Sequence, residues 1–148
     1  MKAIVATLVL GHVLGGSAAL AAAQTRAPSA QEVAVIVHPA NTAVISRDDI
    51  KRLFLGKKSQ FADGHRAKPV YLAQGHQARE YFNWQVLRKS SSQIKAYWSK
   101  LIFTGKGMPP DAIGDVDDLL TLVASERSAI AYIDAAQVTE QVRVVAIY

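Results

Sequence analysis

The 148-residue sequence contains no cysteine. This absence excludes disulfide bonds, thiol nucleophiles and cysteine-ligated metal sites, so packing alone must hold the fold together. Histidine is also scarce, because the chain has only four, and His38, His65 and His76 lack the sequence spacing that metal ligands show. We therefore expect neither a metal site nor a cofactor.

The motifs of common enzyme classes are missing as well. The chain has no Gly-x-Ser-x-Gly motif, and Lys57-Lys58-Ser59 lacks the upstream glycine of a phosphate-binding loop. A net charge of +5 favours anionic partners, but the basic residues are scattered and do not form a stripe that would bind nucleic acid. The sequence thus predicts a protein that is not an enzyme and does not bind nucleic acid.

The N-terminal segment has the pattern of a secretory signal peptide. A single charge at Lys2 is followed by a short apolar run and by alanine-rich residues. Cleavage after Ala21 or after Ala23 fits equally well; a retained membrane anchor is the alternative, although the run is short for a membrane span. We expect a periplasmic or secreted protein without a membrane span after cleavage. Its parts are a signal peptide (1–23), a flexible leader (24–31) and one domain (32–148).

Strands and helices alternate along this domain. Residues 32–37 are rich in valine, isoleucine and alanine, which indicates a strand buried on both faces. Ser46 followed by Asp49 predicts a capped helix start. Similar patterns predict strands at 69–72, 128–133 and 142–147, and helices at 76–88, from 90 onward and at 115–125. The alternation predicts an α/β fold with a small mixed sheet flanked by helices.

The stretch YLAQGHQAREYF, from Tyr71 to Phe82, is typical of a strand end, a glycine turn and a helix start. Free backbone N–H groups at a helix start form a ready site for an anion. Arg79 falls in the first helical turn, where a cation opposes the helix dipole unless an anion is bound beside it. The alternative is a plain connecting turn, with Arg79 solvated or paired with Glu80 or Asp63.

Several motifs together resemble the periplasmic solute-binding proteins of phosphate ABC transporters, and in particular the short single-lobe members of that family. The motif FLGK lies at residues 54–57, FADG at 61–64 and AIAY at 129–132. The resemblance covers nearly all of the chain after the signal peptide. It implies one lobe of a type II periplasmic binding protein, phosphate or another small anion as ligand, and an ABC transporter or sensor component as partner.

The chain departs from this family where the family holds phosphate. The full-length proteins carry Arg-x-x-Gly-Ser-Gly-Thr at the turn, whereas here Leu72 or Ala73 stands near the arginine position. His76, Gln77 and Ala78 stand where the small hydroxyl residues would be. The resemblance therefore implies weak or altered anion binding. The candidate ligand-binding residues are Gln74, Gly75, His76, Gln77, Arg79 and, on the loop after the following helix, Lys106.

A protein-interaction module is the alternative function. In that case the single lobe docks on a transporter or sensor partner and binds no small molecule. Tyr97, Trp98 and Phe103 would then include exposed aromatic anchors. Exposure of these rings, together with the lack of a pocket at Gly75, would favour this alternative.

Overall fold

The computed structural model describes residues 31–148. The expected signal peptide (1–23) and residues 24–30 of the expected leader lie outside this described part. Within it, no helix is both long enough and apolar enough to cross a membrane.

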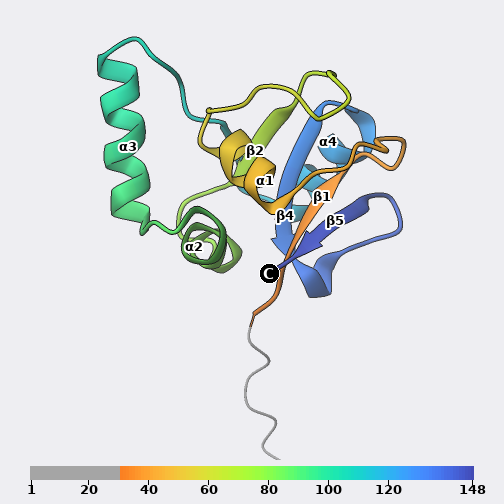
Figure 1. Cartoon of the computed structure of the whole chain (residues 1–148). Coiled ribbons are helices and arrows are strands. Elements are labelled where there is room, and N and C mark those ends of the chain that lie inside the picture. Colours follow the sequence, from red (N-terminus) through yellow and green to blue (C-terminus); the bar gives the residue numbers. More distant parts are fainter. Residues whose placement is uncertain (1–30) are drawn as a thin grey trace, which may run out of the picture.

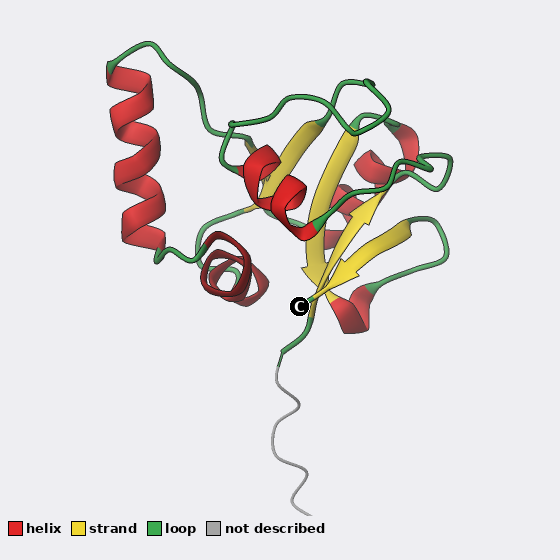
Figure 2. Ribbon diagram, in the orientation of Figure 1, coloured by secondary structure: helices red, strands yellow, loops and turns green. Residues whose placement is uncertain are grey.

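Five strands form one mixed sheet in the order β3-β2-β4-β1-β5 (Figures 1 and 2). Strand β2 runs parallel to β3 and to β4, whereas β1 is antiparallel to both of its neighbours, β4 and β5. This arrangement confirms the predicted α/β class with a small mixed sheet. The bounds of the strands are β1 Val33–Val37, β2 Lys68–Leu72, β3 Asp111–Ile113, β4 Ala129–Asp134 and β5 Arg143–Ile147.

Strand β1 is the centre of the core. All five of its side chains are completely buried, as the apolar run at residues 32–37 predicts. It pairs with β4 from Val33 opposite Asp134 to Val37 opposite Ile130. On its other side it pairs with β5, with one irregularity between Val35 and Ile36.

Helices cover both faces of this sheet. In Figure 1, α1 (Arg47–Phe54) lies in front of the sheet and α4 (Val116–Ser125) lies behind it. On the α1 side, α2 (Gln77–Phe82) contributes Phe82, whose ring stacks on Tyr132 of β4 with 3.9 Å between ring centres. Phe54 of α1 packs edge-on against Phe82 at 4.8 Å, so one aromatic layer joins both helices to the sheet.

Two elements differ from the sequence prediction. The predicted helix at 76–88 is divided, because α2 ends at Phe82 and a π-helical turn, η1, follows at Asn83–Leu87. Asn83 is fully buried and donates its side-chain N–H to Ser91 Oγ at 3.1 Å, and its backbone carbonyl accepts from the Lys89 N–H. Strand β3 was not predicted, because its three residues lie at the sheet edge and show no apolar alternation.

Helix α3 (Ser91–Phe103) stands apart from the sheet at the left of Figure 1. It is attached through Ile94 and Trp98, which are buried, and through the Tyr97 hydroxyl, which donates to the Leu55 carbonyl at 2.6 Å. The Trp98 ring passes close to Gly56, where an added Cβ would lie 3.0 Å from the ring and where φ is +66°. Glycine is therefore needed at position 56 for two independent reasons.

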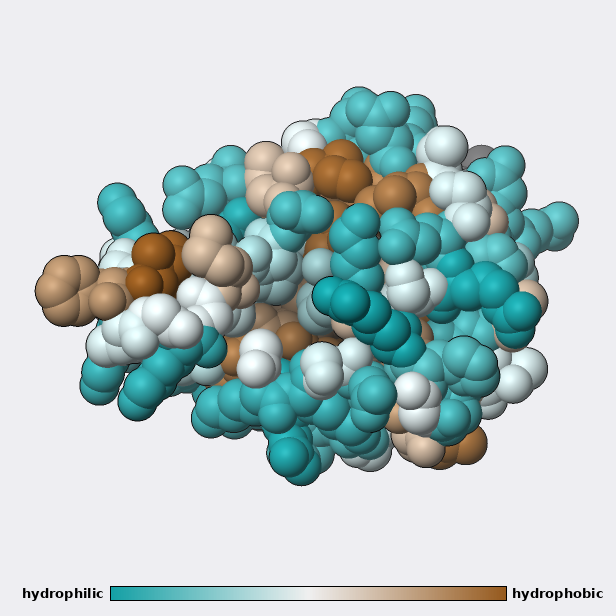
Figure 3. Space-filling view, turned by 90° about the horizontal axis from the view of Figure 1, so that it is seen from above, coloured by the Kyte–Doolittle hydropathy of each residue, from teal (hydrophilic) through white to brown (hydrophobic). Residues whose placement is uncertain are grey.

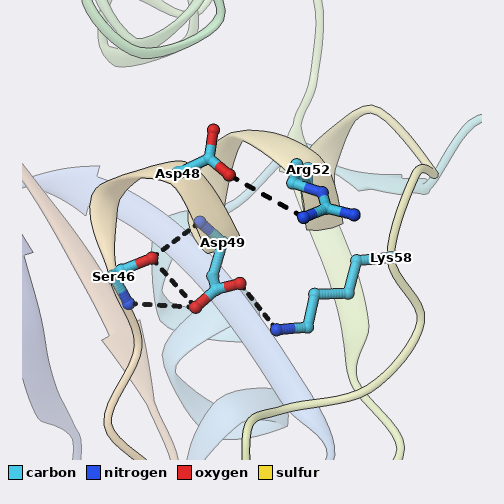
Figure 4. A network of polar contacts seen from close by, with 5 residues as sticks. All are labelled: Ser46, Asp48, Asp49, Arg52 and Lys58. Carbon is cyan, nitrogen blue, oxygen red and sulfur yellow. Dashed lines mark hydrogen bonds and ion pairs between the residues drawn. The ribbon is translucent and has the colours of Figure 1, made fainter.

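A polar network confirms the predicted start of α1 (Figure 4). Ser46 Oγ accepts from the Asp49 backbone N–H at 3.0 Å, and the Asp49 carboxylate accepts from the Ser46 N–H and from Lys58 Nζ, the latter at 2.6 Å. The bonds from Lys58 and Ser46 hold the pKa of the Asp49 carboxyl below its usual value of 3.8. The neighbouring Asp48–Arg52 pair is longer, at 3.9 Å, and more exposed.

We predict that Asp49→Asn lowers the free energy of unfolding by about 0.5–2 kcal/mol at neutral pH, because it weakens both the cap and the bond to Lys58. A depressed pKa in the folded state means that this stabilisation is present at neutral pH and is lost as the pH falls through that pKa. Urea denaturation at a series of pH values should therefore show the difference from wild type shrinking below about pH 4.

Asp48→Asn is the matched control, since its carboxylate takes part only in an exposed ion pair, and it should have little effect at any pH. If Asp49→Asn lowers the free energy of unfolding by the same amount down to the lowest pH at which the protein is folded, the carboxylate charge does not contribute to stability.

Candidate functional site

The Gly75 turn, defined here as residues 73–76, leaves the carboxyl end of β2 and leads into α2. Because β3 and β4 run parallel to β2, their carboxyl ends lie at the same edge of the sheet. Gly75 has φ +84°, a left-handed conformation that a side chain would strain. Gln74, Gly75 and Gln77 are exposed and His76 is half-buried.

The start of α2 lacks a side-chain cap. His76 takes the extended conformation of an N-cap residue, with φ −72° and ψ 128°, but its side chain accepts no bond from the helix. The other α-helices of the described chain are capped by Ser46, Ser90 and Asp115. The His76 carbonyl accepts from Arg79 and Glu80 N–H, and no acceptor within residues 31–148 serves the N–H groups of Gln77 and Ala78. Gln77 is exposed, so its N–H is available to an anion, whereas Ala78 is completely buried.

Arg79 is buried, so the alternatives of a solvated arginine or one paired with an acidic residue are wrong. The residue is only 9% exposed, so it is not solvated, and it forms an ion pair with neither Glu80 nor Asp63. Its Nη1 donates to the Leu72 carbonyl at 2.7 Å, and its guanidinium carbon lies 4.9 Å from the centre of the Tyr71 ring. In the described part of the chain, no carboxylate lies within the 4.0 Å of an ion pair.

The Arg79 charge is thus only partly compensated. A guanidinium carries five N–H donors, and the Leu72 carbonyl accepts from one of them. Tyr71 does not supply a negative charge, since burial raises the pKa of its hydroxyl to about 12 and keeps it neutral. A buried cation without a counter-ion is costly, so an anion bound beside Arg79 would be stabilising.

Lys106 does not join the other candidates. It lies on the loop between α3 and β3, and this loop enters β3 at the amino end of the parallel strands. The Gly75 turn lies at their carboxyl end. Figure 1 shows α3 running away from α2 along its length, so that the loop after α3 begins at the end of this helix that is distant from the turn. The sequence could not show this separation because it did not reveal β3.

Aspartate side chains lie at the same edge of the sheet as the Gly75 turn, and the sequence did not predict that they would be near it. The Ala73 N–H donates to the Ile113 carbonyl at 2.8 Å, so the end of β3 adjoins the turn. Asp115 follows two residues later and caps α4, accepting from the N–H groups of Asp117 and Asp118 at 2.8 and 3.1 Å. These carboxylates lower the local affinity for an anion. The signal that could have revealed them is Asp115 with two further aspartates directly after a strand.

Three surface hollows, of about 570, 390 and 520 Å³, lie away from the Gly75 turn. The first lies between α1, η1 and the last residues of the chain, and the second lies beside Asn41 and Arg127. The third runs between α1, the start of β2 and the Trp98 ring. None of the three is lined by residues 73–79.

Comparison with known proteins gives a match at the level of structure. No family model matches the chain, and no curated protein matches its sequence. An ABC-type phosphate transport receptor from Vibrio cholerae superposes with a TM-score of 0.60 at 14% identity, over 78% of this chain and 45% of that chain. A phosphate ABC transporter substrate-binding protein from Clostridium perfringens, with bound phosphate, gives 0.60 at 17% identity over the same shares.

PstS from Borrelia burgdorferi gives a TM-score of 0.56 at 8% identity, over 78% of this chain and 47% of that chain. These structures confirm the resemblance indicated by the sequence at the level of the fold: the chain has the fold of one lobe of phosphate-binding proteins. It spans less than half the length of each of the three.

Because Arg79 is part of the core, we predict that Arg79→Ala lowers the free energy of unfolding by about 1.5–3 kcal/mol through loss of the charge-assisted bond to Leu72. Urea denaturation measures this change. Arg52→Ala, which removes an exposed arginine, should change stability by less than about 0.5 kcal/mol. Equal effects of the two substitutions would mean that the Leu72 bond contributes nothing.

Proposed function

We propose that this protein is an exported, non-enzymatic binding protein whose Gly75 turn binds a small oxyanion such as phosphate with low affinity. The observation that carries the proposal is the buried Arg79 guanidinium, which has no carboxylate partner in the described chain and lies behind an uncapped helix start. Phosphate is bound in the Clostridium perfringens protein of similar fold. The proposal extends anion binding from that fold to this chain.

The proposed contacts combine backbone and side-chain donors. The N–H group of the exposed Gln77 and the remaining N–H groups of Arg79 can donate to oxyanion oxygens. Gln74 and His76 flank the turn as further side-chain contacts. The His76 backbone N–H already donates to the Ala73 carbonyl at 3.3 Å, so it serves the turn itself.

The affinity is low for two physical reasons. The turn is open to water, where each polar contact is screened and contributes little. The aspartates at the start of α4 add a repulsive field at the same sheet edge. A dissociation constant near a millimolar, about −4 kcal/mol, fits this balance.

The proposal includes export and a partner. We infer that residues 1–23 direct export and that the protein acts in the periplasm or outside the cell, beside a component of an ABC transporter or a sensor. The similar structures from Vibrio cholerae and Clostridium perfringens are described as components of phosphate transport, which supports this inference.

Gln77→Pro tests the anion site without touching the core. Proline is tolerated at the first position of a helix, and the extended His76, with ψ 128°, suits a residue that precedes proline. The substitution removes one N–H donor, so phosphate affinity should fall about tenfold, equivalent to roughly 1.4 kcal/mol, while stability changes little. Titration of backbone amide NMR shifts with phosphate and sulfate at constant ionic strength measures this change.

Gln77→Ala is the matched control, because it removes the side chain and keeps the N–H donor; its affinity should stay close to that of wild type. Unchanged amide shifts at residues 74–79 in tens of millimolar phosphate would contradict the proposal, as would equal affinities of the proline and alanine variants.

A protein-interaction module is the second candidate, and the tip of α3 favours it. Phe103 is 91% exposed, and Ile102 and Met108 beside it are also exposed. Figure 3 shows apolar side chains gathered on the protrusion at its left, where α3 lies in Figure 1. Around this tip, residues 100–110 contain two basic residues, Lys100 and Lys106, and no acidic one, so an acidic partner surface would suit it.

The other aromatic residues of α3 are not anchors. Trp98 is only 5% exposed and belongs to the core, which corrects the expectation that it would be available to a partner. Tyr97 is half-buried and its hydroxyl is bound to Leu55. A negative titration at the Gly75 turn would leave the tip of α3 as the better-supported functional surface.

A further inference from the structure

A hollow of about 570 Å³ on another surface of the domain is rich in positive charge. It lies between the first turn of α1, the end of η1 and the end of β5, and Arg47, Lys51 and Arg88 line it. We propose that this basic hollow is a second binding site, for a small polyanion that carries two or more carboxylate or phosphate groups on a short skeleton. This site shares no residue with the Gly75 turn and does not depend on anion binding there.

The three cations have no protein counter-ion in the described chain. No side-chain carboxylate lies within 4.0 Å of any of them. Asp48 also lines the hollow, but its carboxylate is directed to Arg52 on the same helix at 3.9 Å. With Asp48 counted against the three cations, the side chains that line the hollow carry a net charge of +2, which a bound polyanion would balance.

Arg47 is held in place by the end of the chain. Its Nη2 donates to the Ile147 carbonyl at 3.0 Å, and its guanidinium carbon lies 4.3 Å from the centre of the Tyr148 ring. These contacts restrict the side chain, so less conformational entropy is lost when it binds an anion. Burial raises the pKa of the Tyr148 hydroxyl, which therefore stays neutral and does not oppose an anion.

Arg88 occupies a backbone position that favours glycine over arginine. It ends η1 with φ 57° and ψ 40°, the left-handed conformation in which glycine is the preferred residue. It is the only non-glycine residue with positive φ in residues 31–148. Its side chain is exposed and lines the hollow, so its guanidinium is accessible to a ligand there.

The shape and chemistry of the hollow select for multiple charges. Its volume is within the range of small-molecule sites, and it is larger than a single simple ion requires. Each solvent-exposed ion contact contributes little, so an anion with one charge gains too little to bind. A ligand that contacts all three cations gains from each of them, and Val86 and Ile147 offer apolar surface to its skeleton.

The test is a titration of the purified protein at constant ionic strength with citrate, pyrophosphate, inorganic phosphate and acetate. Calorimetry and backbone amide NMR shifts measure the binding. Citrate or pyrophosphate should shift the amides of residues 47–51, 85–88 and 146–148, and acetate should not. The carboxylate and phosphate arms distinguish the two classes of polyanion, since the tighter of citrate and pyrophosphate identifies the preferred group.

Two variants remove one charge each without disturbing the core. Lys51→Gln and Arg88→Gly should each weaken the tighter polyanion about tenfold, and Arg88→Gly should remain folded because glycine suits the left-handed backbone. Lys57→Gln is the matched control, since Lys57 lies further along the chain and does not line the hollow. Arg88→Lys keeps the charge and should restore most of the affinity lost in Arg88→Gly.

Equal loss of affinity in Lys57→Gln and Lys51→Gln would overturn the proposal, because it would show attraction to net charge alone. Unperturbed amides around the hollow at tens of millimolar citrate and pyrophosphate would overturn it too. So would an Arg88→Gly variant that binds as tightly as wild type.

Discussion

Complete burial of β1 is the constraint on which the rest of the fold depends. Its side chains are excluded from water on both faces, and its backbone is hydrogen-bonded to β4 on one side and β5 on the other. A strand of this kind requires helices on both faces of the sheet, because its apolar side chains alternate between the two faces. The aromatic layer beneath α1 and α2 and the apolar face of α4 meet this requirement. The carboxyl edge of the parallel strands, which carries the Gly75 turn, is positioned by this packing.

The sequence predicted those features of the fold that depend on interactions between residues close together in the chain. The apolar run of β1, the Ser46 cap and the glycine at position 75 each reflect a preference within a few residues, and each is confirmed. The π-helical turn depends on the contact of buried Asn83 with Ser91 of another helix, and β3 exists because β2 offers it an edge. No pattern within either segment encodes those partners.

The candidate site shows the same limit. The position of Arg79 in the first turn of a helix was predictable, but its burial was not, because burial depends on Tyr71 and Leu72 beneath it. The aspartates beside the turn also became visible only when β3 placed the start of α4 at that edge. Sequence reasoning therefore located the turn, and tertiary packing decided its charge environment.

Arg79 and the basic hollow stabilise anions in physically different ways. At the Gly75 turn one nearly buried cation, Arg79, lies behind a surface that is open to water, so the contacts with an anion are few and partly screened, and the aspartates nearby oppose them. In the basic hollow three cations lie near the surface, and each contact is individually weak. Binding by the hollow therefore depends on the number of charges that the ligand carries and on the ionic strength. Binding at the turn depends on the direction of a few hydrogen bonds, and a small oxyanion with several acceptor oxygens satisfies these best.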